Sequence, residues 1–362
     1  MGKKTALFEV HKNLGATIVD FGGWDMPVQY TTVIDEHNAT RNSAGLFDIS
    51  HMGEIKVKGK QATELLQKTM SRDVTKAKPG KMLLAVICNE KGGILDDLTI
   101  YKFSEEKFML VVNGANEIKD FNWIKKIKEE NNFEVEVKNS SSEFSKLDLQ
   151  GPNSEKILQK IVDFDLKEIG FYEFKEAKID GVDGIVSRSG YTGETGFELY
   201  FPWDSALQIW NKIMEIGKEF NIKPIGLGAR DTLRLECAMN LYGNEMDETK
   251  TPLQARYGWV LDLDKDFIGR EAILKQKEQG VKGKLVGFEL TERGIARHGY
   301  KIFKDSEEIG EVTSGTLSPT LKKALGLCYI KTEFSKPDTE IEIEIRGKKT
   351  KAKIVKIPFY KK

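Results

Sequence analysis

Short runs of alternating or periodic apolar residues mark the first part of the chain. Residues 54–57 (Glu-Ile-Lys-Val) alternate polar and apolar side chains, which is typical of a strand with one buried face. Residues 61–70 place Ala62, Leu65 and Leu66 on one side of a predicted helix. The other elements predicted here are strands at 94–101, 108–112 and 133–137, and a helix from Ile118 with an apolar residue at every third position. This order predicts an α+β unit between about residues 52 and 138.

A second series of elements follows Pro152, a residue that suits the first turn of a helix. That helix is predicted to carry apolar residues at positions 157, 158, 161 and 162. Two strands, at 185–186 and 197–201, flank a glycine-containing loop at 190–193. A helix with a buried stripe at Ala206, Ile209, Trp210 and Ile213 comes next, and another is predicted at 229–238.

The pattern changes near residue 280, beyond which strands and turns dominate. Residues 341–345 (Ile-Glu-Ile-Glu-Ile) alternate without interruption, and 284–290 and 311–314 also have the composition of strands. The C-terminal part is therefore predicted to be an all-β module.

Two adjacent acids, Asp96 and Asp97, follow a turn sequence at 89–93 (Asn-Glu-Lys-Gly-Gly) and lie on the predicted strand 94–101. Successive side chains of a strand point to opposite faces, so these carboxylates cannot share one site. Asp97 has the parity of Thr99, on the more polar face, whereas Asp96 has the parity of the apolar residues. We therefore expect Asp97 to be the acid that faces a cleft.

Composition limits the classes of protein that the chain can represent. A length of 362 residues predicts two or three domains. Lys plus Arg and Asp plus Glu are equal, at 56 each, so no overall charge attracts nucleic acid or an anionic membrane. Three widely spaced cysteines and the lack of an apolar signal core predict free thiols and a cytoplasmic location, or the mitochondrial matrix if a presequence has been removed.

The common catalytic signatures are missing from the sequence. It contains no phosphate-binding glycine loop, no His-Glu-x-x-His and no Gly-x-Ser-x-Gly. Its four histidines lack the spacing of metal ligands, so no metal is expected. What remains is a set of glycine-containing loops, each near a charged residue, at 92–97, 190–198 and 226–231.

These loops belong to an ordered set of motifs spread over almost the whole chain. The set comprises 21–27 (Phe-Gly-Gly-Trp-Asp-Met-Pro), 47–53 (Phe-Asp-Ile-Ser-His-Met-Gly), 92–97 (Gly-Gly-Ile-Leu-Asp-Asp), 189–194 (Ser-Gly-Tyr-Thr-Gly-Glu), 228–236 (Gly-Ala-Arg-Asp-Thr-Leu-Arg-Leu-Glu), 241–244 (Leu-Tyr-Gly-Asn) and 312–319 (Val-Thr-Ser-Gly-Thr-Leu-Ser-Pro). In this order they resemble the T-protein family of the glycine cleavage system, the tetrahydrofolate-dependent aminomethyltransferases.

The resemblance assigns roles to individual residues. The catalytic aspartate of the family falls on Asp97, in agreement with the strand parity. The pterin-holding glutamate and its arginine fall on Glu198 and Arg230, and a carboxylate can accept the adjacent N–H groups of a pterin edge. Three further positions of the folate site fall on Met52, Asn113 and Tyr191. Taken alone, each of these residues also fits a plain structural role, such as a solvated acid, an ion pair or core packing.

The resemblance also implies the fold. It implies an α+β protein arranged as a three-domain cloverleaf around a central folate funnel, with a C-terminal β-barrel or jelly-roll-like domain. The domains implied are 1–51 with 139–245, an inserted α+β domain at 52–138, a connecting segment at 246–279 and the barrel at 280–362. At Leu84 and Met239 some family members have an aromatic residue, so here apolar contact is expected to replace stacking on the pterin.

The implied reaction moves the aminomethyl carbon from the lipoyl arm of the H-protein to tetrahydrofolate. Its products are 5,10-methylenetetrahydrofolate, ammonia and the dihydrolipoyl H-protein. Two alternatives stay open at this point. One is a folate-dependent demethylase of a small methylated substrate on the same fold, and the other is a non-catalytic folate-binding relative that assists iron–sulfur assembly.

Overall fold

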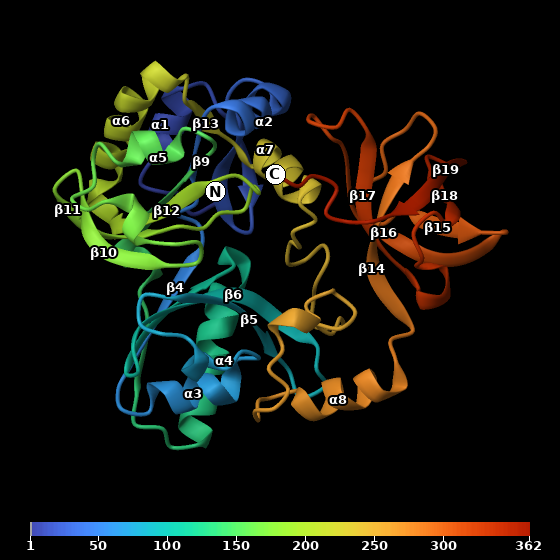
Figure 1. Cartoon of the computed structure of the whole chain (residues 1–362), viewed down its shortest axis with the longest axis horizontal. Coiled ribbons are helices and arrows are strands. Elements are labelled where there is room, and N and C mark those ends of the chain that lie inside the picture. The colour runs from blue at the N-terminus through green and yellow to red at the C-terminus, as the bar shows by residue number, and fades with distance from the viewer. Residues whose placement is uncertain (1) are drawn as a thin grey trace. The chain divides into compact units, whose positions relative to one another are not determined.

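The computed structural model describes residues 2–362 and divides into two compact units (Figure 1). The first unit comprises Met1–Gln67, Asp73–Leu84 and Leu98–Asp231, and the second comprises Lys68–Arg72, Ala85–Asp97 and Thr232–Lys362. Four of the helices and strands contribute residues to both units: helix α3 (Ala62–Thr69), strands β5 (Met82–Cys88) and β6 (Ile94–Ser104), and helix α7 (Leu227–Glu236).

A six-stranded sheet in the first unit has the order β10-β11-β12-β9-β3-β13. Its strands are β3 (Gly45–Asp48), β9 (Phe144–Gln150), β10 (Phe174–Ile179), β11 (Val182–Ser187), β12 (Gly196–Pro202) and β13 (Lys223–Ile225). Strand β13 runs parallel to β3, and the other pairs are antiparallel. Strands β9 and β12 thus lie in the middle of the sheet, each with a neighbour on both sides.

The two faces of this sheet differ in chemistry because its central strands alternate. On β9, Leu147 and Leu149 join the apolar core that includes Ile157 of α5 and Trp210 of α6, and Lys146, Asp148 and Gln150 occupy the opposite face. The helices of this part are α1 (Phe8–Asn13), α2 (Val33–Asn42), α5 (Ser154–Leu158) and α6 (Ala206–Gly217). The polar residues of β9 are buried as well, so each of them needs a hydrogen-bonding or charged partner in the candidate site.

The predicted helices of this part are present with changed limits. The buried stripe of α6 is confirmed at all four predicted positions. Helix α5 begins at Ser154 and ends at Leu158, so Ile161 and Val162, predicted on the same helix, lie beyond it. Helix α7 begins at Leu227 rather than at residue 229.

A five-stranded sheet has the order β5-β6-β7-β4-β8 and completes the α+β part. Its remaining elements are β4 (Gly53–Lys58), α3 (Ala62–Thr69), β7 (Lys107–Val112), α4 (Glu117–Glu130) and β8 (Glu136–Asn139). A separate hairpin pairs β1 (Thr17–Phe21) with β2 (Trp24–Gln29).

Two predictions for this sheet were wrong in detail. On α4 the buried face is Asp120, Ile124 and Ile127, at i, i+4 and i+7, while Ile118 is exposed because it lies on the other side of the helix. The predicted strand 133–137 begins only at Glu136, because the N–H of Val135 donates to the carbonyl of Phe133 in a turn.

In the second unit, six strands close into a barrel of order β14-β17-β16-β15-β18-β19 (Figure 1). The elements of this part are helix α8 (Arg270–Gln279) and strands β14 (Gly283–Leu290), β15 (Lys301–Lys304), β16 (Glu307–Leu317), β17 (Ala324–Lys331), β18 (Glu340–Ile345) and β19 (Lys348–Val355). The α+β class with a C-terminal barrel is thereby confirmed, while the predicted domain limits and the cloverleaf stay predictions. Within residues 2–362, no helix has both the length and the apolar character that a membrane span requires.

Two of the sequence motifs meet at Glu245, the residue after a third motif, in a buried ionic cluster of the second unit. The Arg234 guanidinium donates to Glu245 Oε2 at 2.7 Å and to Ser314 Oγ at 2.8 Å. Thr313 and Ser314 donate their hydroxyls to Glu245 Oε1. The side chains of Arg234 and Glu245 are only 1% and 0% exposed, so the charges depend on one another and on the two hydroxyls.

We predict that Arg234→Met lowers the free energy of unfolding by about 3–5 kcal/mol, because it leaves the Glu245 charge buried without its partner. Urea unfolding followed by circular dichroism measures the change. The matched control is Lys301→Met, which removes a lysine from an exposed pair with Glu311 and should change stability little. Equal stability of Arg234→Met and the wild type would contradict a structural role for the cluster.

Candidate active site

Strand register places two carboxylates opposite one another on the polar face of the six-stranded sheet. Glu198 of β12 pairs with Asp148 of β9 on one side and with Ser187 of β11 on the other. Side chains at directly paired positions lie about 5 Å apart at Cβ, so two like charges there are unfavourable unless other groups compensate. The surroundings of these two acids show how the compensation is made.

Glu198 receives three hydroxyl donors, all on one oxygen. Its Oε2 accepts from Ser189 Oγ at 2.7 Å, from Tyr200 at 3.3 Å and from Tyr101 at 3.4 Å. Both tyrosines are fully buried, and burial together with the Glu198 charge holds their pKa values well above the usual range. They therefore stay donors. Within residues 2–362, no donor reaches Oε1 of this partly exposed side chain, so that oxygen can accept from a ligand.

Arg230 lies on α7 and pairs with the second acid. Its Nη1 donates to Asp148 Oδ2 at 3.3 Å, and its guanidinium carbon lies 4.7 Å from the ring centre of Tyr191. The arginine side chain is 14% exposed while Asp148 is fully buried. The stack on Tyr191 and the bond to Asp148 fix the plane of the guanidinium and leave its other N–H groups for an acceptor.

Asp148 is the most perturbed acid of the site. Burial and the neighbouring charge of Glu198 raise its pKa to about 8, although Arg230 and Gln150 act in the opposite direction. Burial therefore favours the protonated form of this carboxyl, while the bonds from Arg230 and Gln150 favour its charged form. Residues with such shifts are frequent at functional sites, although structural networks produce them too.

Buried contacts hold the loop between β11 and β12, which carries Tyr191. The Arg41 guanidinium donates to the carbonyl of Thr192 at 2.6 Å and pairs with Glu194 at 3.0 Å. The side chains of that pair are 4% and 1% exposed. Because several buried contacts hold this loop, Tyr191 has a defined position beneath Arg230 before any ligand arrives.

Met52 and Asn113 lie at the ends of neighbouring strands. The residue after Met52, Gly53, pairs with Val112, the residue before Asn113. Met52 also packs against the cluster that contains Tyr101 and Tyr200. Next to it, burial and the charges of Arg230 and Lys146 lower the pKa of His51 to about 3, so this histidine is neutral. The five residues that the resemblance assigns to folate all belong to the first unit.

Asp97 belongs to the second unit, where it is the last residue of the range Ala85–Asp97. The turn before its strand is closed by Asn89, whose Oδ1 accepts from the N–H groups of Lys91 and Gly93 at 3.0 Å each. Asp96 is fully buried and Asp97 is partly exposed, as strand parity predicts, and a cleft at Asp97 stays a prediction. The hydroxyl of Tyr257 donates to Asp97 Oδ2 at 3.3 Å.

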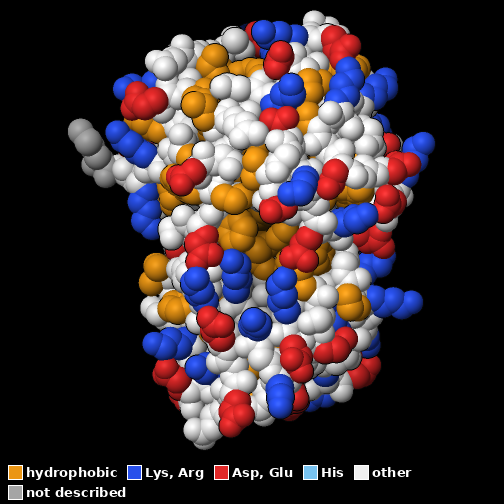
Figure 2. Space-filling model, turned by 90° about the vertical axis from the view of Figure 1, so that its left-hand side faces the viewer, with side chains coloured by type: hydrophobic (Ala, Val, Ile, Leu, Met, Phe, Trp, Pro, Cys, Tyr) orange, Lys and Arg blue, Asp and Glu red, His pale blue; other side chains and the backbone are white. Residues whose placement is uncertain are grey.

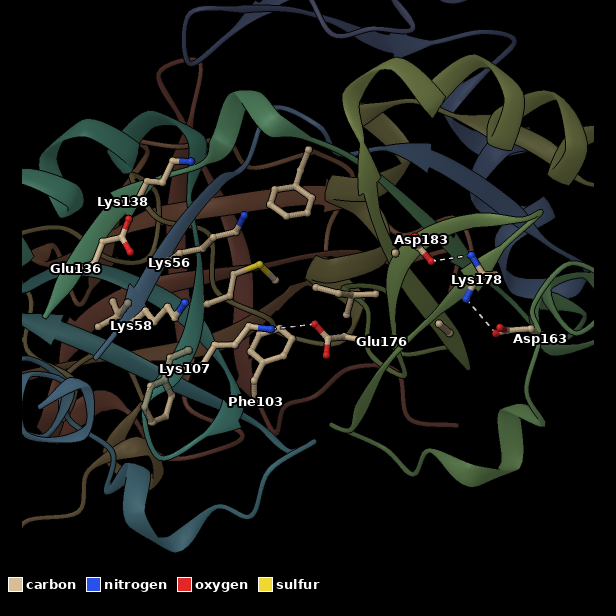
Figure 3. Close-up of a pocket in the computed structure, with 17 residues that line it drawn as sticks. Lys56, Lys58, Phe103, Lys107, Glu136, Lys138, Asp163, Glu176, Lys178 and Asp183 are labelled. Atoms are coloured by element: carbon tan, nitrogen blue, oxygen red, sulfur yellow. Dashed lines mark hydrogen bonds and ion pairs between the residues drawn. The ribbon is translucent and has the colours of Figure 1, made fainter. Parts of the chain in front are cut away.

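A groove elsewhere in the first unit has a different lining. It has a volume of about 740 Å³ and lies between strands β4, β7 and β8 on one side and β10 and β11 on the other. Figure 2 shows apolar side chains at the base of a hollow with charged side chains around it. Figure 3 shows Lys107 and Glu176 paired across the groove. None of the six residues predicted for the site lines this groove, so the candidate site rests on the polar row of β9 and β12.

Sequence reasoning missed Asp148 and Gln150, the residues beneath Glu198 and Arg230. The signal was present at 146–150 (Lys-Leu-Asp-Leu-Gln), where three polar residues alternate with two leucines. Such alternation is typical of a strand with one solvated face, and nothing local indicates that the polar face is buried too. Only the pairing with β12 and the approach of α7 show it.

The combined groups define what the site can bind. A free carboxylate oxygen, a fixed guanidinium fork and the Tyr191 ring fit a flat heterocycle with adjacent N–H donors and a carbonyl acceptor. Within residues 2–362, no group of three or more His, Cys, Asp or Glu side chains is arranged to hold a metal ion.

Comparison with known proteins agrees with the fold. The model of the GCVT N-terminal domain matches residues 7–265, and that of the glycine cleavage T-protein C-terminal barrel domain matches 284–361. The aminomethyltransferase of Natranaerobius thermophilus is 52% identical over 364 residues, covering 99% of each chain. That of Thermoanaerobacter sp. strain X514 is 51% identical, covering 99% of this chain and 98% of its own.

A solved structure is similar over the same length. The crystal structure of glycine cleavage system aminomethyltransferase T from Bartonella henselae has a TM-score of 0.93 and 34% identity, covering 99% of this chain and 98% of the other. The fold and these relatives therefore define a folate-dependent type of transferase with a C-terminal barrel. The chain belongs to the glycine cleavage T-protein family. The demethylase and iron–sulfur alternatives are not favoured by these relatives.

We predict that Asp148→Asn makes stability less dependent on pH. The folded-state pKa of Asp148 is raised to about 8, above its unfolded value, so its carboxyl stabilises the fold fully below pH 4. That contribution is lost as the pH rises from about 4 to about 8. Asp148→Asn lacks this loss. The free energy of unfolding of Asp148→Asn minus that of the wild type should therefore increase as the pH rises from about 4 to about 8. Urea unfolding at pH 5, 6, 7 and 8 measures it.

The exposed acid Asp183 offers a matched control, because Asp183→Asn should leave the pH dependence of stability as in the wild type. Parallel curves for Asp148→Asn and the wild type would contradict the raised pKa.

Proposed function

We propose that the chain catalyses aminomethyl transfer from the lipoyl arm of the H-protein to tetrahydrofolate. The carbon leaves one sulfur and one nitrogen atom and forms two bonds to folate nitrogens. The two folate N–H protons are delivered to the departing amine, which leaves as ammonia, and to the lipoyl sulfur, which becomes a thiol. All atoms balance without an oxidant or reductant.

The observation that carries this proposal is the Glu198 carboxylate with its unshared Oε1. Three hydroxyls orient the side chain through Oε2, so the second oxygen is available to N–H donors at the edge of a pterin. Arg230 offers its fork to a carbonyl or carboxylate, and Tyr191 supports the guanidinium from below. Asn113 supplies a donor and an acceptor, and Met52 supplies apolar contact.

We propose Asp97 as the catalytic carboxylate. Its carboxylate is partly exposed, in contrast to Asp96, and Tyr257 orients it through Oδ2. A carboxylate in this role stabilises the positive charge that develops at the reacting carbon. It also helps a folate nitrogen to lose its proton. The other residues act by holding the reactants in position.

The partner proposed is the lipoylated H-protein, which would carry the aminomethyl group to the site. The direct test mixes the chain with tetrahydrofolate and aminomethyl-loaded H-protein. Ammonia and methylenetetrahydrofolate should form in equal amounts. Turnover of a small methylated donor in place of the loaded H-protein would indicate a demethylase, and folate binding without any turnover would indicate a binding protein.

We predict that Asp97→Asn lowers turnover about 10²-fold or more, because a positioned acid–base group contributes 10²–10⁴ to the rate. The dissociation constant for tetrahydrofolate should stay within about threefold of the wild type, since the folate-holding residues are unchanged. Stopped-time ammonia assays and equilibrium binding measure the two quantities.

Asp96→Asn is the matched control, because Asp96 is fully buried on the opposite face of the same strand. It should reduce stability and leave turnover of the folded fraction nearly unchanged. Full activity of Asp97→Asn would exclude the catalytic role.

A further inference from the structure

The side-chain amide of Gln150 donates from both of its N–H groups and accepts one hydrogen bond inside the first unit. Its Nε2 donates to Asp148 Oδ1 at 2.5 Å and to the carbonyl of Ser189 at 2.9 Å. Its Oε1 accepts from Thr192 Oγ1 at 2.7 Å. A flipped amide would point its oxygen at a carboxylate and a carbonyl, so only one orientation is compatible with these partners.

Two glycines make room for this amide. Gly196 is the residue directly opposite Gln150 on β12, and Gly190 lies in the loop that carries Tyr191. A Cβ at either glycine would overlap the Gln150 amide. Gly190 and Gly196 are therefore explained by close packing on this one side chain, which leaves the amide little space to move.

A continuous chain of hydrogen bonds runs from one proposed folate-holding residue to the other through this amide. Arg230 donates to Asp148, and Gln150 donates both to Asp148 and to the backbone of Ser189. The hydroxyl of Ser189 then donates to Glu198. Each link is buried or partly buried, where a hydrogen bond is stronger and an unmet partner more costly than in water.

We propose that Gln150 is a positioning residue for folate binding, which fixes Glu198 and Arg230 in one mutual geometry through Ser189 and Asp148. The inference rests on the proposed function, because it takes these two residues to hold the pterin. Gln150 itself is fully buried and need not touch the ligand. It acts on affinity, since a preorganised pair of ligand-holding groups loses less freedom when the ligand binds.

The isosteric change Gln150→Glu tests this role because it replaces the N–H donor by a carboxyl. The ionisable groups around that position are Asp148 and Glu198 on the sheet, Arg230 on α7, and the Arg41–Glu194 pair at the loop. Three of these are acids, so the new carboxyl donates to Asp148 only while it holds a proton. Its effect should therefore depend on pH, which the loss of simple packing would not cause.

The experiment measures tetrahydrofolate binding to the full chain by titration calorimetry, without oxygen, from pH 6 to pH 9. For Gln150→Glu we expect a dissociation constant within about threefold of the wild type at pH 6 and at least tenfold weaker at pH 9. At saturating folate, kcat and the KM for loaded H-protein should change less than threefold. Thr192→Val removes the donor to Gln150 Oε1, and a loss of affinity of about threefold or more is expected.

Gln159→Glu is the matched control, since Gln159 is an exposed glutamine of the same unit that binds only loop backbone. It should leave the affinity and its pH dependence unchanged. In a Glu198→Gln background, the effect of Gln150→Glu should largely disappear, because the residue it positions has already been altered.

The possible outcomes separate this inference from the proposed function. A wild-type chain that fails to bind tetrahydrofolate contradicts the proposed function itself. A wild type that binds, with Gln150→Glu and Thr192→Val folded and equally tight at pH 9, overturns the positioning role alone. A weaker affinity of Gln150→Glu that is the same at every pH also overturns it, because that indicates a general loss of packing.

Discussion

The structure of the candidate site depends on a row of polar side chains that is buried on a central strand. Lys146, Asp148 and Gln150 of β9 lie fully out of solvent, although burying an unpaired charge costs several kcal/mol. Each of them has a specific partner: Glu54 of β4 pairs with Lys146, Arg230 of α7 donates to Asp148, and Thr192 in the loop before β12 donates to Gln150. The strand can tolerate this row because its other face, Leu147 and Leu149, belongs to the main apolar core of the unit.

The need to partner these buried polar side chains restricts the conformations of the loop at 189–195 and of the start of α7. Arg230 is needed to offset the acids of the sheet, and Gln150 needs glycine at two positions around it. The same contacts leave one oxygen of Glu198 and part of the Arg230 guanidinium available to the ligand that we propose. Groups that hold a ligand from a fixed scaffold lose little entropy on binding, so stability and recognition come from one network.

Much of the fold could be predicted from periodicity alone, as the buried stripe of α6 and the alternating strand β18 show. The limits of the helices and the exposure of Ile118 on α4 could not be predicted in this way, because they depend on which side of each element packs against the sheet. The roles proposed for Glu198, Arg230 and Asp97 came from the family resemblance that the ordered motifs carry. Asp148 and Gln150 did not, because their alternation with leucine looks like that of any half-solvated strand, and only tertiary pairing shows that both faces are covered.

The most direct test of the account is a crystal structure of the chain with tetrahydrofolate. The account predicts the pterin edge within hydrogen-bond distance of Glu198 Oε1, with the Arg230 guanidinium still paired to Asp148 and stacked on Tyr191. Folate bound in the groove between β4 and β10, or a pterin whose nearest carboxylate is not Glu198, would contradict it.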